Sequence, residues 1–461
     1  MRHTYTRFGL VLAAVTVVAC SGVLDVKDPD IIDPGDVQNF DGAIAAYNGA
    51  IGDFAFANDG DNGANEGQIL VSGVMTDEYS DVETFPTRIE YDSRAINERN
   101  GTLTGVYFNL AKARVAAEGA AKALQTYTDT TATSRVRIGE MLALAGYTYV
   151  YFAENYCSAV PFSERLPDGS IDYGQPLNTN AVLDRGIARF DSALQILGTA
   201  SASITRLARV GKGRALLDKG DFAGASAAVA AVTAGQYQTA HSIATGRQNN
   251  GVYVFNNPSG SRGGTARFGV SDVEGTNGLP FRAGDLRDSV VNGVVILKRN
   301  RVPTQQIGLG FDNTSPLWVN LAYAGPTSPV TVASFVEARL IRAEVALNAG
   351  ASAAGIDTLN AIRADLANNG GFTLAALADP GTAAGRVDLL FRERAFWLFA
   401  TGHRLGDLRR LVRAPYNRAA TSVYPVGTYP KGTVYGANTE LPVPFDERNN
   451  PLYTGCDYNT P

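Results

Sequence analysis

The stretch DLLFRERAFWLFATGHRLGDLRRL, residues Asp388 to Leu411, decides the fold of this chain. Its first part predicts a helix that has almost no polar face after Ala395, and a helix that is apolar all round is a buried one. Gly402 supplies the positive φ angle that ends such a helix. Residues 403–412 then predict a second, short helix.

Many charged side chains lie within this apolar stretch, namely Arg392, Glu393, Arg394, His403, Arg404, Asp407, Arg409 and Arg410. A buried charge without a partner costs several kcal/mol, so we expect these groups to be paired. The expected structural ion pairs involve Glu393, Arg394, Arg404 and Asp407. A catalytic carboxylate–arginine site is the alternative, but the sequence places no nucleophile and no metal ligands nearby.

The composition is that of an ordinary globular protein, with 461 residues, 18% charged residues and a formal net charge of -5. This length is sufficient for one large core or two smaller ones. A weakly acidic chain without a run of lysines and arginines gives no reason to expect nucleic acid as a partner. Three histidines and three cysteines are few for a metal enzyme, and we expect no metal and no cofactor.

The N-terminal residues are typical of a secretory signal. Arg2 and Arg7 precede the apolar run of residues 8–19, which is too short to span a membrane. We therefore expect residues 1–19 to be a signal peptide that is removed. An uncleaved anchor and a plain signal peptide without lipidation are the alternatives.

The signal ends in VVAC at residues 17–20, which resembles a lipobox, the motif whose cysteine is acylated and becomes the mature N-terminus. We expect lipidation of Cys20, and each buried CH₂ of its acyl chains would contribute ~0.8 kcal/mol to membrane binding. Residues 20–36 then predict an extended, lipidated tether. This leaves Cys157 and Cys456 as a pair in an oxidising compartment, for which we expect a disulfide. Two unrelated thiols are the alternative.

Helix pairs recur along the remaining chain. Residues 182–197 and 204–217 predict two helices, and the glycines, the Gly-Asp-Phe turn at 220–222 and the small residues that follow have tetratricopeptide spacing. Residues 334–366 repeat this pattern. The predicted fold class is therefore mainly α, a tetratricopeptide-like helix-pair scaffold with an irregular, loop-rich insertion that carries a few short strands.

The body of the protein is predicted to extend from residue 37 to residue 461. Helical repeats are expected at about 101–235 and 333–412, and the loop-rich insertion at about 236–332. A proline-rich C-terminal segment, 413–461, follows.

Three separated motifs resemble hallmarks of the SusD/RagB family. They are Glu393-Arg394, Leu398, Gly402-His403-Arg404, Asp407-Leu408 and Arg410; Ala343-Glu344 with Leu359-Asn360-Ala361-Ile362-Arg363; and Glu440-Leu441-Pro442-Val443-Pro444 with Asn449-Asn450-Pro451-Leu452. With the lipobox and the helical repeats, the resemblance covers most of the mature chain. Members of this family are surface lipoproteins that capture nutrients for a partner transporter in the outer membrane.

Catalytic motifs are not found in the sequence. It contains no GxSxG, no HExxH, no Walker A loop and no GxGxxG after a strand. His241 and His403 are isolated, and we interpret both as surface or hydrogen-bonded structural residues. The polar run 58–66 has spacing similar to a calcium loop without the required ligand order, so we interpret it as a solvated loop. We therefore expect no enzymatic activity.

The sequence supports binding of a sugar better than it supports catalysis. Sugar sites combine aromatic platforms with polar side chains. Residues 77–91 and the insertion, which includes Phe311, both have this mixture. The resemblance implies that ligands meet loops from these two parts of the chain. The candidate ligand residues are Tyr79, Phe85, Tyr91 and Trp318 as platforms and Asp77, Arg88 and Asn320 as polar partners. For each aromatic residue, ordinary packing or a transporter contact is the alternative.

The resemblance therefore implies a lipid-anchored, non-catalytic protein of the outer membrane, facing the cell surface. It would bind a nutrient, most simply an oligosaccharide or polysaccharide fragment, and pass it to a SusC-like TonB-dependent transporter. A tetratricopeptide-type scaffold lipoprotein that organises envelope proteins without a small ligand is the second hypothesis. An extracytoplasmic hydrolase is the third.

Overall fold

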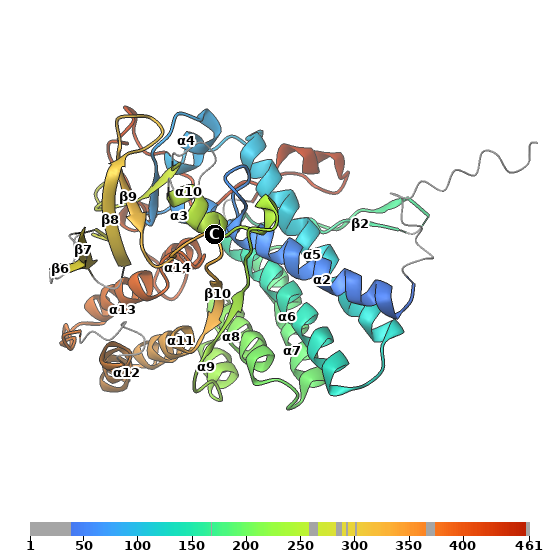
Figure 1. Cartoon of the computed structure of the whole chain (residues 1–461). Coiled ribbons are helices and arrows are strands. Elements are labelled where there is room, and N and C mark those ends of the chain that lie inside the picture. The colour runs from blue at the N-terminus through green and yellow to red at the C-terminus, as the bar shows by residue number, and fades with distance from the viewer. Residues whose placement is uncertain are drawn as a thin grey trace, which may run out of the picture.

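The computed structural model describes residues 38–166, 168–257, 266–282, 288–291, 294–299, 302–365 and 374–457. The expected signal peptide, the lipidation site Cys20 and the tether lie outside these residues. Helices dominate the described chain and the strands are short (Figure 1). The predicted fold class, a mainly α scaffold with a few short strands, is confirmed.

The helices have the following bounds: α2 (Phe40–Asp59), α3 (Gln68–Val74), α4 (Pro86–Asp92), α5 (Gly101–Tyr127), α6 (Ala132–Asn155), α7 (Thr179–Leu197), α8 (Ala202–Asp218), α9 (Phe222–Val229), α10 (Gly251–Asn256), α11 (Phe335–Asn348), α12 (Ser352–Ala364), α13 (Ala383–Trp397) and α14 (Arg404–Val412). Three short 3₁₀ helices are η2 (Gly246–Gln248), η3 (Ala420–Ser422) and η4 (Phe445–Asn449).

The strands form small antiparallel sheets. Their bounds are β1 (Tyr79–Asp81), β2 (Glu164–Arg165), β3 (Ile171–Asp172), β4 (Gln236–Thr239), β5 (Phe268–Val270), β6 (Asp288–Val291), β7 (Val294–Arg299), β8 (Val302–Leu309), β9 (Pro316–Asn320) and β10 (Val330–Ser334). Strands β6, β7, β8 and β9 pair in that order, and the pairs β1–β5, β2–β3 and β4–β10 stand alone. Within the apolar run 290–297, in which we expected strand, residues 290–291 belong to β6 and residues 294–297 to β7, and these two strands pair antiparallel.

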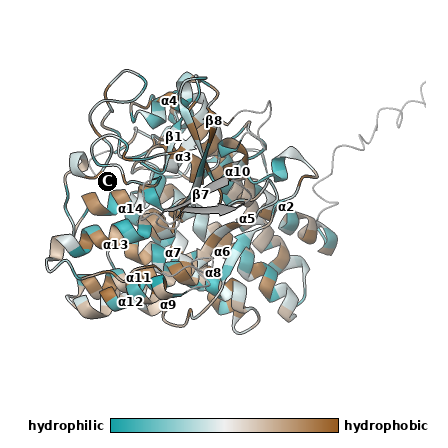
Figure 2. Ribbon diagram, turned by 60° about the vertical axis from the view of Figure 1, so that its left-hand side comes forward, coloured by the Kyte–Doolittle hydropathy of each residue, from teal (hydrophilic) through white to brown (hydrophobic). Residues whose placement is uncertain are grey.

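Helix α6 is the centre of the helical scaffold. It packs against α5, α7 and α8, and these four helices run side by side (Figure 1). Nearly every residue of α6 from Ile138 onward is buried. Figure 2 shows hydrophobic and hydrophilic segments alternating around α9, α11 and α12, as expected for outer helices that each bury one face.

Phe190 of α7 sets the distance between α6, α7 and α8, because its ring lies over two glycines. A Cβ atom at Gly146 would lie 2.6 Å from the ring, and one at Gly211 would lie 2.4 Å from it. Close packing of this kind leaves no room for an added methyl group. The interpretation of the Gly211-Lys212-Gly213 sequence as a packing feature is consistent with this contact.

Gly211→Ala is therefore expected to destabilise the protein by about 1–3 kcal/mol, since the new methyl group forces Phe190 or the backbone to move. Gly119 of α5 is the matched control, because it is exposed within a helix and a Cβ atom there meets nothing within 4 Å. Gly119→Ala should stabilise the protein by about 0.5–1 kcal/mol. Urea denaturation of the two variants measures both effects, and a shift of the same sign in both would contradict this account of the packing.

The turns within the helix pairs match the sequence prediction. Gly220 has a φ of 78° between α8 and α9, and Asp221 caps α9 by accepting a hydrogen bond from the backbone N–H of Gly224. Gly350, between α11 and α12, also has a φ of 78°. Only glycine adopts this conformation without strain, so these residues fix where each pair turns.

Two local predictions need correction. Residues 69–97, expected to be irregular, contain α3, β1 and α4. The run 58–66, expected to be solvated, is partly buried: Asp59 is 0% exposed with its carboxylate 3.2 Å from His241, and Asp61 accepts hydrogen bonds from Ala64 and Asn65. Asp61 is satisfied within the turn and Asp59 pairs with a histidine from a distant part of the chain, which is why a hydrophilic sequence can be buried there.

Residues 388–411 form a helix, a turn and a second helix, as predicted. Helix α13 ends at Trp397, earlier than expected, and both Ala400 and Gly402 have positive φ angles, of 57° and 73°. The turn places α14 against α6 and α3. Among the described residues, no helix has the length and apolarity needed to cross a membrane.

The expected ion pairs of this stretch are present and buried. Arg394 contacts Asp407 at 2.8 Å, Glu393 contacts Arg363 of α12 at 2.8 Å, and the partner of Arg404 is Asp77, at 2.6 Å. Two of the three pairs thus join the stretch to distant parts of the chain.

Cys157 and Cys456 form a disulfide, with their Cα atoms 5.6 Å apart. The bond ties the C-terminal tail to the residues that follow α6. The backbone N–H of Val443 contacts both sulfur atoms, with its nitrogen 3.4 Å from that of Cys157 and 3.3 Å from that of Cys456.

Candidate binding site

Two of the predicted aromatic platforms are buried. Tyr79 and Tyr91 are both 0% exposed, and their rings pack against Phe399 and Phe268. A ring with no exposed face cannot stack on a sugar in this structure, so the prediction for these two residues is wrong. Both rings stabilise the core instead. Ordinary packing was the alternative that we gave for each aromatic residue.

The predicted polar partners are also buried, each with a structural partner. Asp77 accepts two hydrogen bonds from Arg404, and Asn320 donates to the hydroxyl of Tyr79 at 3.4 Å. Arg88 donates to Glu66 and to Glu83. These residues are not ligand contacts in this structure, because pairing of buried polar groups uses the atoms that a sugar would need.

Phe85 and Trp318 are the two candidate residues that keep accessible surface. Phe85 is 53% exposed, immediately before α4. Trp318, on β9, is partly buried against the core, and the Arg282 guanidinium lies 5.3 Å from its ring. Phe85 is therefore the better supported of the two as a platform, while Trp318 stays a prediction.

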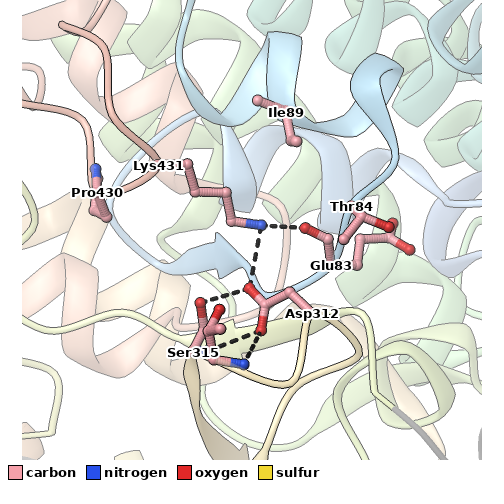
Figure 3. Close-up of a pocket in the computed structure, with 8 residues that line it drawn as sticks. Glu83, Thr84, Ile89, Asp312, Ser315, Pro430 and Lys431 are labelled. Carbon is pink, nitrogen blue, oxygen red and sulfur yellow. Dashed lines mark hydrogen bonds and ion pairs between the residues drawn. The ribbon is translucent and has the colours of Figure 1, made fainter.

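A pocket of about 440 Å³ has Thr84, the residue that precedes Phe85, in its lining (Figure 3). Its walls come from three parts of the chain: the β1–α4 connection, the β8–β9 turn and the segment that follows α14. The lining residues are Glu83, Thr84, Ile89, Asp312, Thr314, Ser315, Pro430 and Lys431. The volume is in the range of small-ligand sites, and the lining is mostly polar.

The β8–β9 turn is held against the β1–α4 connection. Asp312 donates its backbone N–H to the carbonyl of Val82, and a Cβ atom at Gly310 would lie 2.4 Å from Val82. Within the turn, Asp312 accepts hydrogen bonds from the backbone of Thr314 and Ser315 and from the Ser315 hydroxyl. These bonds fix the carboxylate at the edge of the pocket.

Lys431 closes the pocket from the third side. Its ammonium group donates to the Asp81 carboxylate and to the Glu83 carbonyl, and it lies 3.5 Å from the Asp312 carboxylate (Figure 3). One side chain thus links the post-α14 segment to both of the other walls.

Two exposed phenylalanines are sequence neighbours of residues that line the pocket. Phe85 follows Thr84, and Phe311, which is 37% exposed, precedes Asp312. The Arg88 guanidinium lies 5.3 Å from the Phe85 ring, and that of Arg267 lies 4.0 Å from the Phe311 ring.

Both arginines contact the same carboxylate, that of Glu83, at 2.6 Å and 3.3 Å. The two rings are thereby held on either side of a buried acid. An aromatic ring fixed in this way loses little conformational freedom when a ligand stacks on it.

The segment after α14 is anchored by buried contacts behind the pocket. Arg94 donates to the carbonyls of Pro425, Gly436 and Asn438. The Tyr429 hydroxyl donates to Asp92 at 2.7 Å. Burial, together with the nearby charge of Asp81, raises the pKa of Asp92 to about 7.

Asp92 is therefore expected to make stability depend on pH. An unfolded aspartate has a pKa of about 3.9, so between about pH 4 and pH 7 the folded state binds more protons and its stability falls as the pH rises. From pH 5 to pH 8 this loss amounts to about 2 kcal/mol. Asp92→Asn keeps an oxygen that can accept from Tyr429 and carries no charge, so its stability should fall less over this range. The free energy of unfolding of both proteins is measured by urea denaturation at pH 5 and at pH 8. An equal loss in the wild type and in Asp92→Asn would contradict this assignment.

Sequence reasoning missed Asp312 and Lys431. Residues 414–438 read as a loop rich in tyrosine, proline and glycine, and nothing in that pattern indicates which cation returns to β1. The signal that could have been used is Phe311-Asp312-Asn313, a turn pattern in the segment that connects β8 and β9.

Metal ligands do not gather in the part of the chain that the structure describes: no group of three or more His, Cys, Asp or Glu side chains there could hold an ion. The polar run 58–66 accordingly forms a hydrogen-bonded turn. The site offers stacking surfaces, hydroxyl groups and carboxylate acceptors, which is the chemistry of reversible recognition.

Comparison with known proteins places the fold. No model of a known protein family matches this chain, and no curated protein matches its sequence. Solved structures do match. A SusD superfamily protein from Parabacteroides distasonis has a TM-score of 0.64 at 15% identity, over 91% of this chain and 99% of that one.

Two further structures are similar over nearly their whole length. A SusD-like carbohydrate-binding protein from Bacteroides fragilis has a TM-score of 0.64 at 14% identity and covers 90% of this chain and 99% of its own. A laminarin-binding SusD-like protein has a TM-score of 0.56 at 15% identity, over 91% and 99%. The chain therefore has the SusD fold, and the resemblance carried by the three sequence motifs is confirmed at the level of the fold.

Proposed function

We propose that this protein is a non-catalytic, lipid-anchored binding protein of the outer membrane that captures a glycan and passes it to a SusC-like TonB-dependent transporter. The observation that carries the proposal is the pocket between the β1–α4 connection and the β8–β9 turn, together with the exposed Phe85 and Phe311, which adjoin the lining residues Thr84 and Asp312 in sequence. Exposed rings next to hydroxyl and carboxylate groups fit the apolar faces and polar edges of a sugar.

The fold supports this proposal, because solved structures with the same fold include proteins described as carbohydrate-binding and as laminarin-binding. The lipobox ending at Cys20 supports the membrane anchor. The transporter follows from the family resemblance alone, and its test is separate: purification of the native protein from detergent-solubilised outer membrane should recover a TonB-dependent barrel. Recovery of envelope assembly proteins instead would favour the scaffold hypothesis.

Removal of the two exposed rings tests glycan binding. Phe85→Ala and Phe311→Ala should each weaken binding about tenfold, because loss of one stacking ring costs on the order of 1.4 kcal/mol. Isothermal titration with laminarin, pullulan and galactomannan measures the affinities. Phe40→Ala is the matched control, since Phe40 is an exposed phenylalanine, 51% accessible, at the first residue of α2.

Unchanged affinity in the double variant Phe85→Ala/Phe311→Ala would remove this pocket from the function. Phe85 is 53% exposed and Phe311 is 37% exposed, so we expect each variant to lose at most about 1 kcal/mol of stability, and urea denaturation checks this.

A further inference from the structure

We infer that the pocket selects uncharged sugar chains and discriminates against acidic ones such as uronates. The inference rests on the proposed function and specifies its substrate class. It follows from how the charged side chains around the pocket are paired.

The cation that lines the pocket is already neutralised by acids. Lys431 contacts the carboxylates of Asp81 and Asp312, and its remaining contact is the Glu83 carbonyl. Its side chain is 20% exposed. A ligand carboxylate could reach Lys431 only by competing with two fixed acids of the protein, and nothing in that exchange favours the ligand.

The two arginines beside the aromatic rings are paired as well. Arg88 contacts Glu66 and Glu83, and Arg267 contacts Glu83. Recognition of a carboxylate by arginine usually requires both N–H groups of the guanidinium fork. In this structure the guanidinium N–H groups of Arg88 already contact the carboxylates of Glu66 and Glu83.

The balance of charge around the pocket is negative. Four carboxylates, those of Glu66, Asp81, Glu83 and Asp312, are paired with three cations, those of Arg88, Arg267 and Lys431. Among the described residues that line the pocket, Asp312 and Glu83 carry negative charge and Lys431 alone carries positive charge. An acidic ligand would meet an excess of like charge in a partly enclosed site.

Neutral sugars, in contrast, match what the pocket offers. The exposed residues Thr84 and Thr314 carry hydroxyl groups that can donate hydrogen bonds to a sugar or accept them from it. The rings of Phe85 and Phe311 need only the CH face of a pyranose. Nothing in this arrangement calls for a charge on the ligand.

The decisive experiment compares each polymer with its own charged form. Laminarin, pullulan and galactomannan are titrated before and after selective oxidation of their primary hydroxyls to carboxylates, in 20 mM and in 500 mM NaCl. At low salt we expect the neutral form to bind at least tenfold more tightly than the oxidised form. The difference should shrink at high salt, because screening weakens the repulsion.

Two variants change the charge of the pocket without touching the rings. Asp312→Asn keeps an oxygen for the turn and removes one negative charge, and Thr314→Lys adds an unpaired cation at an exposed turn position. Each should raise the ratio of oxidised-form to neutral-form affinity at least threefold. Using both variants guards against a fold defect in either one.

The outcomes separate the two proposals. Equal or tighter binding of the oxidised form by the wild-type protein would overturn the inference and leave glycan capture standing. Failure of every neutral and oxidised polymer to bind, or binding that ignores the loss of both phenylalanines, would overturn glycan capture at this pocket and the inference with it.

Discussion

Asp407→Asn is expected to lower the free energy of unfolding by about 3–5 kcal/mol, because it breaks a buried ion pair and leaves its arginines without a full complement of charge. Asp407 is 2% exposed and accepts two hydrogen bonds from Arg394, each at 2.8 Å. It also lies 3.0 Å from Arg410. Asparagine keeps the shape of the side chain but replaces one accepting oxygen by an amide donor, so the loss reports the charge together with one hydrogen bond to an arginine.

The effect is large because the pair belongs to a network. Arg410 also contacts Glu344 and Asp218, each at 3.0 Å, and Tyr416 donates to Glu344 at 2.9 Å. The network joins α8, α11, α13 and α14. Loss of the Asp407 charge therefore leaves arginines of α13 and α14 with fewer carboxylate partners. Replacing a whole network by apolar residues can be neutral, whereas removing a single member is costly.

The pH dependence of stability provides a second readout. Burial raises the pKa of Asp407, but the charges of Arg394 and Arg410 outweigh burial and hold the pKa well below its usual value. A depressed pKa adds stability above the unfolded value of about 3.9, and this stability is lost as the pH falls toward the folded value. Below about pH 4 the wild type should therefore lose stability more steeply than Asp407→Asn.

Asp53→Asn is the matched control. Asp53 also has two cationic partners, Lys112 at 3.2 Å and Arg247 at 2.6 Å, but their side chains are 60% and 46% exposed. Water replaces the lost contact there, so we expect a change of only about 0–1 kcal/mol. Equal losses in Asp53→Asn and Asp407→Asn, measured by urea denaturation, would show that burial does not set the strength of the network.

This network also shows how far the sequence alone reaches. Charges inside an apolar stretch must be paired, and that rule correctly predicted buried pairs for Glu393, Arg394, Arg404 and Asp407. It did not identify the partners Arg363 and Asp77. Those residues lie on α12 and just before β1, and their approach depends on tertiary packing that no local pattern records.

The binding site illustrates the opposite failure. The sequence indicated the two regions that form two walls of the pocket, since both mix aromatic and polar residues. Within them, composition does not distinguish a buried tyrosine from an exposed phenylalanine. Tyr79 and Tyr91 fill the core while Phe85 and Phe311 face solvent, because the positions of α4 and of the β8–β9 turn decide which rings are covered.

The double variant Cys157→Ala/Cys456→Ala is expected to lose about 2–5 kcal/mol of stability, because the disulfide closes a loop of 299 residues and restricts the unfolded chain. The bond also fixes the tail beside the end of α6, where Tyr156 and Leu441 form a parallel bridge and the Leu441 N–H donates to the Asn155 carbonyl.

Urea denaturation without a reducing agent measures the loss in the variant. The control is wild-type protein that is unfolded and refolded in excess dithiothreitol. Its stability should fall to that of the double variant, since both lack the disulfide. Stability of the oxidised wild type equal to that of the variant would mean that packing of the tail, and not the covalent link, holds it in place. A wild type that remains more stable than the variant under reduction would show that the two thiols contribute through their contacts with Val443.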